Sequence, residues 1–312
     1  MDNLQYIKSF GVIIFLSKTI RRLTLNSDSK ISWMVNNCNE KLIMKKLEEL
    51  TAIEDKNWDI SKYLKKKNHS VPDEPIWVMW YQGFSNAPEI VRCCVRSIEL
   101  NNTKHKVIVL SEKNLSDYIE MPEFINEKFK KGWISRQHYA DMVRLYLLYV
   151  YGGAWIDATV LNTKEIQDEY FEKSFYSIKF GKRTKDPSHG RWTTFCLFAH
   201  KGNELVRDTL DKHFKYWYKN SIPIDYVMFD YFISSLLEKN KAYALQIESV
   251  DKNNCNVFDL VQRLNDKFVD ELPIKDETVL YKLSWKRIIK THLEDGSETN
   301  FGALLRMMSP YM

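Results

Sequence analysis

The stretch SRQHYADMVRLYLLYVYGGAWIDATVL, residues 135–161, combines a helix pattern, a glycine break and a strand pattern. Apolar residues recur at helical spacing over 139–150, between a capping serine and the stop signal Gly152. The short apolar run 154–156 is typical of a buried strand. Asp157 therefore stands where that strand emerges, and open α/β sheets bind ligands at the carboxyl ends of their strands.

Strand patterns and helix patterns alternate on both sides of this stretch. Apolar runs at 76–80 and 106–110 predict strands, and 88–100 between them predicts a helix. Such alternation predicts an α/β fold with a mainly parallel sheet, right-handed connections and flanking helices. The other predicted elements are strands at 154–160, 175–180 and 192–199 and helices at 203–220 and 225–239.

Two further segments concern the organisation of the chain. Residues 38–67 are rich in Lys, Glu and Leu and predict exposed helices, and the turn-rich VPDEP at 71–75 follows them. We therefore expect a helical extension over 1–70 and a second domain over 71–312. The polar loop GKRTKDPSHGR, residues 181–191, has two open interpretations, a mobile lid or a surface hairpin.

Composition excludes several classes of protein. With 312 residues, 44% of them hydrophobic, the chain is long enough to bury one large core. The net charge of +5 is modest and no basic run with interleaved aromatic residues dominates, so we expect no nucleic-acid partner. The five cysteines include no CxxC pair, which indicates neither a disulfide framework nor a zinc site and favours a reducing, cytoplasmic location.

An apolar run lies near the start of the chain. FGVIIFL, residues 10–16, is too short for a transmembrane helix, which needs about 20 residues. A small-residue cleavage site does not follow it, so a signal peptide is poorly supported. Lys18, Arg21 and Arg22 come next. Residues 6–22 therefore either pack on the domain as a helix or form a peripheral contact with an anionic membrane, at the inner face of the plasma membrane.

The segment ADMVRLYLLYVYGGAWIDATV, residues 140–160, resembles the DxD-containing sugar transferases grouped as capsular polysaccharide synthesis proteins. These are related to the yeast initiating mannosyltransferase and the clostridial glucosylating toxins. The match is strongest over 76–202 and continues more loosely through IDYVMFDYF and YKLSWK. The resemblance implies a glycosyltransferase A-type, Rossmann-like fold. It also implies transfer of a sugar, with retention of configuration, from a nucleoside diphosphate sugar such as a UDP-sugar to a cell-surface glycan or its lipid-linked precursor.

The resemblance also implies a divalent cation, Mn²⁺ or Mg²⁺, and a catalytic role for Asp157 as its ligand. A carboxylate-bound cation neutralises the charge that develops on the leaving diphosphate. This chain reads Asp157, Ala158, Thr159, so a neutral hydroxyl replaces the second acid of DxD. We therefore expect a weak metal site at Asp157 and Thr159 that the diphosphate of the donor completes.

Other residues match donor-binding positions of the family. Asp141 and Arg144 match residues that hold the ribose and the sugar, although their spacing also suits a helical ion pair. Trp80 matches a tryptophan that stacks on the base. His138 on the same helix face is at least as well explained as a core residue. The remaining assignments are Gly153 and Trp155 in the nucleotide-sugar site, Lys282, Trp285 and Lys286 at the diphosphate, and Asp230 as a catalytic acid near the acceptor or the anomeric carbon.

Two alternatives remain. Loss of the second carboxylate suits a noncatalytic sugar- or nucleotide-binding module, and an acid at a strand end also suits a metal-dependent phosphotransferase of surface polymers. Transfer of a phosphosugar would release a nucleoside monophosphate, whereas transfer of a sugar releases a nucleoside diphosphate.

Overall fold

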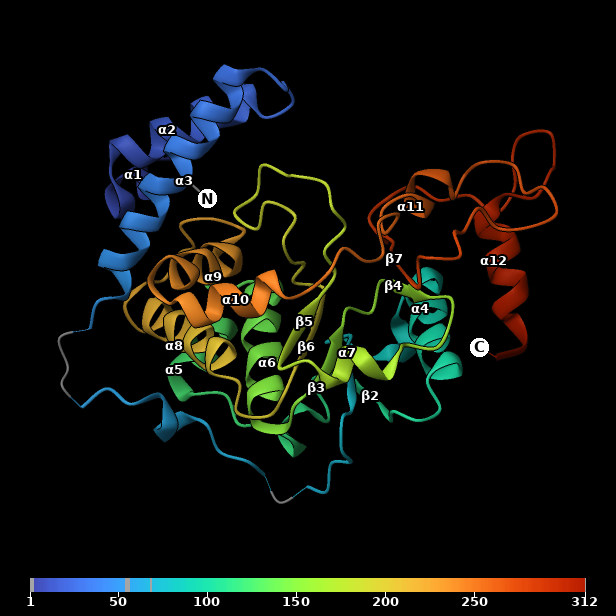
Figure 1. Ribbon diagram of the computed structural model, residues 1–312, viewed down its shortest axis with the longest axis horizontal. Coiled ribbons are helices and arrows are strands. Elements are labelled where there is room, and N and C mark those ends of the chain that lie inside the picture. Colours follow the sequence, from blue (N-terminus) through green and yellow to red (C-terminus); the bar gives the residue numbers. More distant parts are fainter. Residues whose placement is uncertain (1–2, 54–56, 68, 312) are drawn as a thin grey trace.

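The computed structural model describes residues 3–53, 57–67 and 69–311, and these are built around a five-stranded sheet with helices on both faces (Figure 1). The strand order is β2-β1-β3-β6-β5. The strands are β1 (Ile76–Met79), β2 (Val107–Leu110), β3 (Gly153–Ile156), β5 (Phe175–Ser177) and β6 (Cys196–Ala199).

The sheet is parallel in one half and antiparallel in the other. β1 pairs in parallel with β2 and with β3, as the alternating sequence pattern predicts. β6 runs antiparallel to both β3 and β5, because β5 and β6 are consecutive strands joined by a loop instead of a crossover helix. The structure therefore confirms an α/β fold with a sheet rich in parallel pairs, and it limits the parallel arrangement to three strands.

The predicted strand 154–160 is interrupted at Asp157, the predicted metal ligand. β3 ends at Ile156, the chain turns through Asp157, and β4 (Val160–Asn162) begins a second sheet with β7 (Leu280–Lys282). The turn is closed by the Val160 amide, which donates to the Asp157 carbonyl at 2.9 Å. Asp157 is thus placed between the two sheets. The predicted strands at 175–180 and 192–199 are likewise shorter than the apolar runs that suggested them.

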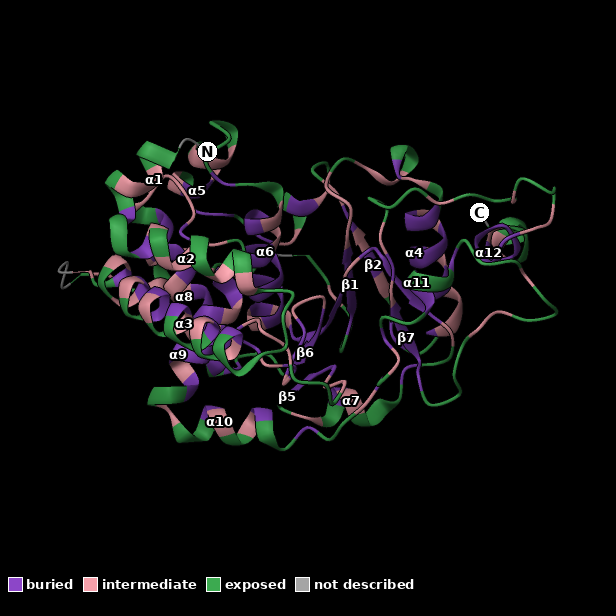
Figure 2. Ribbon diagram, turned by 90° about the horizontal axis from the view of Figure 1, so that it is seen from above, coloured by how far each residue is buried: buried purple, intermediate pink, exposed green. Residues whose placement is uncertain are grey.

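Alternation along β1 explains the two helical layers. Trp77 faces the layer that contains α6 (Arg136–Tyr151), while Ile76 and Val78 face the layer of α4 (Glu89–Asn101). Figure 2 shows the strands of the five-stranded sheet as mostly buried between the two helical layers. The other helices are α1 (Asn3–Phe10), α2 (Val12–Thr24), α3 (Lys30–Thr51), α5 (Glu123–Lys130), α7 (Asp168–Glu172), α8 (Glu204–Lys219), α9 (Met228–Lys239), α10 (Lys241–Glu248), α11 (Leu260–Arg263) and α12 (Asn300–Met308), with short 3₁₀ turns η1 (Ile60–Tyr63), η2 (Phe84–Asn86), η3 (Leu115–Asp117) and η4 (Ser309–Tyr311).

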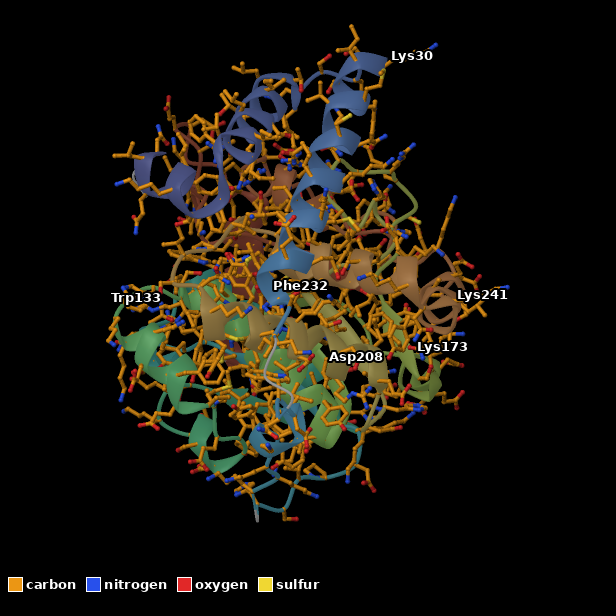
Figure 3. All side chains as sticks on the ribbon, turned by 90° about the vertical axis from the view of Figure 1, so that its left-hand side faces the viewer. Lys30, Trp133, Lys173, Asp208, Phe232 and Lys241 are labelled. Atoms are coloured by element: carbon orange, nitrogen blue, oxygen red, sulfur yellow. The ribbon has the colours of Figure 1, made fainter. Side chains whose placement is uncertain are left out.

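The N-terminal helices α1, α2 and α3 form an arm that leans away from the sheet (Figure 1). Figure 3 faces this side and places Lys30 at the outer tip of the arm. The base of α3 is anchored, because Ile43, Met44 and Leu47 are buried in the same apolar core as α6, α8 and α9. No helix among the described residues is both long enough and apolar enough to cross a membrane.

The two glycines at the start of β3 are required by the backbone conformation and by the space available there. Gly152 and Gly153 have φ angles of 77° and 89°, a region that side chains rarely tolerate. A Cβ at Gly153 would lie 2.2 Å from the Pro75 carbonyl oxygen. The absence of a side chain lets the start of β3 approach the chain entering β1, where the Ala154 amide donates to the Pro75 carbonyl at 2.8 Å.

We expect Gly153→Ala to lower the free energy of unfolding by about 2 to 4 kcal/mol, because backbone strain and a collision with Pro75 add together. Chemical denaturation would measure this. Gly83→Ala is a matched control, since Gly83 has a φ of 90° but a Cβ there would meet none of the described atoms within 4 Å. The control should lose only about 1 kcal/mol. Equal losses in the two variants would contradict the steric explanation.

Candidate active site

A cleft of about 550 Å³ lies beyond the carboxyl ends of β1 and β3. This is the position expected for a ligand site in an open α/β sheet, and the volume is in the range of small-molecule pockets. Segments from six parts of the chain meet here, so the site depends on the complete fold. Residues predicted for the site that do line the cleft are Trp80, Arg144, Trp155, Asp157, Thr159, Lys282, Trp285 and Lys286.

Helix α6 supplies a buried ion pair at the base of the cleft. The side chain of Ser135 caps the helix by accepting from the His138 amide at 3.2 Å. Three residues apart on this otherwise apolar helix, Asp141 and Arg144 are 3% and 4% exposed, and their side chains approach to 3.0 Å. Burial raises the pKa of Asp141, although the charge of Arg144 opposes the shift. The ion pair is thus present, and Arg144 lines the cleft while Asp141 does not, so a role for Asp141 in holding the donor stays a prediction.

Arg144 also connects α6 to the end of β3. One of its terminal nitrogens lies 3.8 Å from Asp157 Oδ1, and the other donates to the Thr194 carbonyl. Its guanidinium sits over the rings of Trp155 and Phe229, at 5.3 and 5.6 Å from their centroids. Nε has no hydrogen-bond acceptor among the described residues. Arg144 lines the cleft, but this nitrogen is itself buried, so it is an unpaired donor beneath the cleft.

Asp157 is held on both of its carboxylate oxygens. Trp155 Nε1 donates to Oδ1 at 2.9 Å, and Lys282 Nζ donates to Oδ2 at 2.7 Å. Burial alone would raise the pKa of Asp157, but the charges of Lys282 and Arg144 outweigh it and lower the pKa. Asp157 is therefore a carboxylate at neutral pH, fixed at the turn between β3 and β4.

Lys282 occupies the position that the sequence assigns to a metal ion. It ends β7, which pairs with β4, and its ammonium lies 2.8 Å from Thr159 Oγ1 as well as 2.7 Å from Asp157. The ring of Phe195 is 4.9 Å away. A positive charge thus already bridges the two oxygens of the Asp-Ala-Thr motif.

The residues fit a divalent cation under two conditions. Carboxylate and hydroxyl oxygens suit Mg²⁺ and Mn²⁺. The described residues include no cluster of three or more His, Cys, Asp or Glu side chains that could hold a metal ion. Asp157 and Thr159 would therefore hold a cation only with oxygens of the donor to complete its shell, and only after Lys282 has moved away.

Two tryptophans from distant parts of the chain meet at the cleft. Trp80 follows β1 and Trp285 follows β7, and their rings lie edge to face with centroids 5.8 Å apart. Trp285 is 45% exposed, and Lys286 Nζ lies 5.9 Å from its ring. Flat aromatic surfaces beside two lysines suit a nucleobase next to a diphosphate.

Two predicted donor-binding residues have other structural roles. Trp155 lines the cleft but is only 2% exposed, and it lies beneath Arg144 and orients Asp157. Gly153 begins β3, at the opposite end of the strand from Asp157, and does not line the cleft. Its role in the structure is the close approach to Pro75.

Asp230 does not line the cleft. It is on α9 and accepts from Trp192 Nε1 at 2.8 Å. Burial, helped by the charge of Asp186, raises its pKa to about 8. A catalytic role for Asp230 stays a prediction. His138 is buried, with ring nitrogens 3.1 Å from Ser135 Oγ and 3.3 Å from the Tyr226 carbonyl, which suits the core interpretation.

The sequence analysis did not predict several of the residues that line the cleft. Tyr226 is 60% exposed and lines the cleft together with Thr194 and Phe195. The loop at 181–191 does not contribute to the cleft and is instead tied to α3, where Lys185 Nζ donates to Ser32 Oγ at 2.7 Å. The nearest sequence signal for Tyr226 was Asp225, which lies in the IDYVMFDYF segment.

The fold and the cleft define an α/β protein whose ligand site lies at the ends of parallel strands. The family model described as "Capsular polysaccharide synthesis protein" matches residues 25–301, so the chain belongs to this family. The assignment made from the central motif is confirmed.

Individual relatives are glycosyltransferases by name. The chain is 31% identical over 173 residues to O-glycosyltransferase braB of Annulohypoxylon truncatum, a match that covers 51% of this chain and 41% of the relative. It is 26% identical over 158 residues to O-glycosyltransferase PaGT of Phomopsis amygdali, covering 46% and 39%. The matches thus span about two fifths of these relatives. Among solved structures, the PaToxG glycosyltransferase aligns with a TM-score of 0.35 and 14% identity, over 69% of this chain and 83% of that one.

The raised pKa of Asp230 predicts a pH-dependent loss of stability. Between the ordinary aspartate pKa of about 4 and the folded value of about 8, the folded protein keeps a proton that the unfolded chain releases. The contribution of Asp230 to the free energy of unfolding is therefore fully present below pH 4 and is lost as the pH rises towards 8. Asp230→Asn keeps the acceptor for Trp192 but cannot ionise, so at pH 8 it should be more stable than the wild type by at least about 1 kcal/mol.

Denaturation profiles at several pH values would measure this difference. Asp28→Asn, at an exposed position, is the control and should leave the profile unchanged. If Asp230→Asn also left it unchanged, Asp230 would be ionised in the folded protein at neutral pH.

Proposed function

We propose that this protein is a glycosyltransferase that moves a sugar from a nucleoside diphosphate, such as a UDP-sugar, to a hydroxyl of a capsular or other cell-surface glycan or of its lipid-linked precursor. Family membership and the names of the relatives support the reaction class. One observation carries the proposal furthest. A fixed carboxylate, a buried arginine and a lysine converge in a cleft lined by two tryptophans.

Each part of the donor has a matching group in the cleft. Trp80 and Trp285 offer aromatic surface to the base. Lys282 and Lys286 can donate to the diphosphate, and the guanidinium of Arg144, which lines the cleft, can donate to sugar oxygens. The ion pair with Asp141 fixes the position of the Arg144 guanidinium. The positive groups stabilise the negative charge that develops on the diphosphate as the bond to the sugar breaks. The acceptor hydroxyl forms the new bond to the sugar with overall retention of configuration and gives its proton to the leaving diphosphate.

A divalent cation is part of this proposal. Bound to Asp157 and Thr159, Mn²⁺ or Mg²⁺ would act as a Lewis acid that neutralises the leaving diphosphate. Lys282 now donates to the same two oxygens, and two cations at this separation repel each other. Binding of the donor would remove this repulsion, because the ammonium of Lys282 could pair with the diphosphate and leave Asp157 and Thr159 to the metal ion. Metal binding should therefore depend on donor binding.

The position of Lys282 also favours a second candidate. If the ammonium never leaves Asp157, the cleft is that of a noncatalytic module that binds a sugar or nucleotide. Such a module would bind donors without cleaving them. A phosphotransferase would be recognised by release of a nucleoside monophosphate in place of a diphosphate.

We expect the protein to hydrolyse at least one member of a panel of nucleotide sugars slowly with Mn²⁺, even without an acceptor, and to release the nucleoside diphosphate. Asp157→Asn should reduce this rate at least about 100-fold, because charge stabilisation at the diphosphate is lost. Asp168→Asn, at an exposed residue that pairs with Lys104, is the control and should retain the rate. Donor binding with no release by the wild type would contradict the transferase proposal in favour of the binding module.

Titration of Mn²⁺ by calorimetry should separate the roles of Lys282 and Asp157. We expect weak binding to the free protein, stronger binding with UDP, and at least about tenfold tighter binding to Lys282→Met without UDP, since a competing charge is gone. Lys286→Met is the matched control, because Lys286 lies at the cleft but no contact with Asp157 is found for it among the described residues. Tight binding to the free wild type that survives Asp157→Asn would contradict the proposed metal site.

A further inference from the structure

The apolar face of α2 points away from the protein. At 3.6 residues per turn, five aliphatic side chains fall within an arc of about 100°. They range from 49% exposed at Ile20 to 83% at Leu23. The full set is Val12, Ile13, Leu16, Ile20 and Leu23. An amphipathic helix on a globular protein normally turns this face towards the core, so α2 is inverted.

Polar contacts hold α2 in the inverted orientation. Lys18 forms an ion pair with Asp225 at 2.7 Å, and Arg21 Nε donates to Asn36 Oδ1 at 2.6 Å. Ser17 Oγ adds a hydrogen bond to Asn39 at 3.0 Å. Rotating the helix to bury its aliphatic face would break all three contacts. The exposed apolar surface is therefore built into the fold.

The neighbouring helices of the arm also expose apolar side chains. Leu4 on α1 is 59% exposed, and Ile31 and Met34 on α3 are 70% and 66% exposed. Figure 2 shows much of α1 and α2 as exposed. Aliphatic residues gathered in this way on a soluble surface indicate a binding face.

Charge around the arm identifies the partner. Residues 3–34 carry five basic side chains and one acidic side chain. Of the basic residues, Lys8, Arg22 and Lys30 are exposed, while the other two point inward to partners. The basic loop at 181–191 lies against α3, with Arg183 stacked 4.6 Å from the Trp33 ring. A second copy of the chain docked face to face would bring these cations together, which like-charge repulsion opposes.

We propose that α1, α2 and α3 form a membrane-binding arm, in which α2 lies in the plane of an anionic bilayer with its aliphatic face among the lipid chains and the basic residues at the headgroups. Aliphatic residues on one face and cations beside them are the features of helices that bind at such interfaces. The proposal does not depend on the transferase reaction. Of the two interpretations of residues 6–22, a helix packed on the domain or a peripheral membrane contact, the proposal favours the membrane contact. It also states that the aliphatic face of α2 is the face that enters the bilayer.

The arm is also joined to the cleft. Tyr6 Oη donates to the Ile224 carbonyl at 2.7 Å, and Lys18 pairs with the adjacent Asp225. The next residue, Tyr226, lines the cleft. A bilayer under the arm would therefore lie near the part of the site that Tyr226 bounds. In combination with the proposed function, this arrangement suits a lipid-linked acceptor.

Co-sedimentation of the full chain with vesicles tests the arm directly. The wild type should bind phosphatidylcholine vesicles that contain phosphatidylglycerol, and binding should weaken with salt and with pure phosphatidylcholine. A variant combining Ile13→Ser, Ile20→Ser and Leu23→Ser should bind at least about tenfold more weakly. The matched control combines Val269→Ser, Ile274→Ser and Ile288→Ser, which are 64%, 41% and 86% exposed but lie outside the arm, and it should bind like the wild type.

Circular dichroism of each variant would check that the exposed substitutions leave the fold intact. Vesicle binding by the arm variant equal to the wild type would overturn the proposal. It would also be overturned if neither protein bound vesicles while light scattering showed a wild-type dimer that the arm variant abolished. Donor hydrolysis without vesicles is measured separately, so loss of vesicle binding and loss of the proposed activity are distinguishable.

Discussion

The buried guanidinium of Arg144 is the interaction on which the site depends. It contacts Asp141 on its own helix, Asp157 at the end of β3 and the carbonyl of Thr194 before β6. Burying a charge is costly unless partners surround it, and removing one partner of a buried pair typically costs about 3 to 5 kcal/mol. Three chain segments are therefore held in one arrangement by a single side chain, and the aromatic rings of Trp155 and Phe229 close around it.

The local features of this centre could be predicted from the sequence because each has a short-range cause. Apolar periodicity and a capping serine define α6, and the glycines that follow end it. The apolar strand that follows these glycines places Asp157 at the carboxyl end of β3. The direction of β5 and β6 was not predictable in this way, because an apolar run does not encode the direction in which it pairs.

The contacts that matter most for the chemistry join distant residues. Lys282 and Asp157 are 125 positions apart, so no spacing rule relates them. The resemblance placed Lys282 at the diphosphate, and the structure adds that its ammonium first neutralises the lone carboxylate of the motif. Gly153 shows the reverse case. Its position in the motif suggested a ligand contact, whereas its surroundings reveal a steric need at Pro75. The N-terminal run is similar, since periodicity reveals an apolar face but not whether that face turns inward.

The junction between α2 and the segment before α9 also affects how an acceptor would be found. An enzyme held at a bilayer searches for a lipid-linked partner by diffusion in two dimensions, so the encounter rate depends on the surface density of that lipid more than on its bulk concentration. The ion pair of Lys18 with Asp225, one residue before Tyr226, ties α2 to the wall of the cleft. If the proposed arm binds a bilayer, this link would keep the cleft close to the membrane surface, where a lipid-linked acceptor would be present.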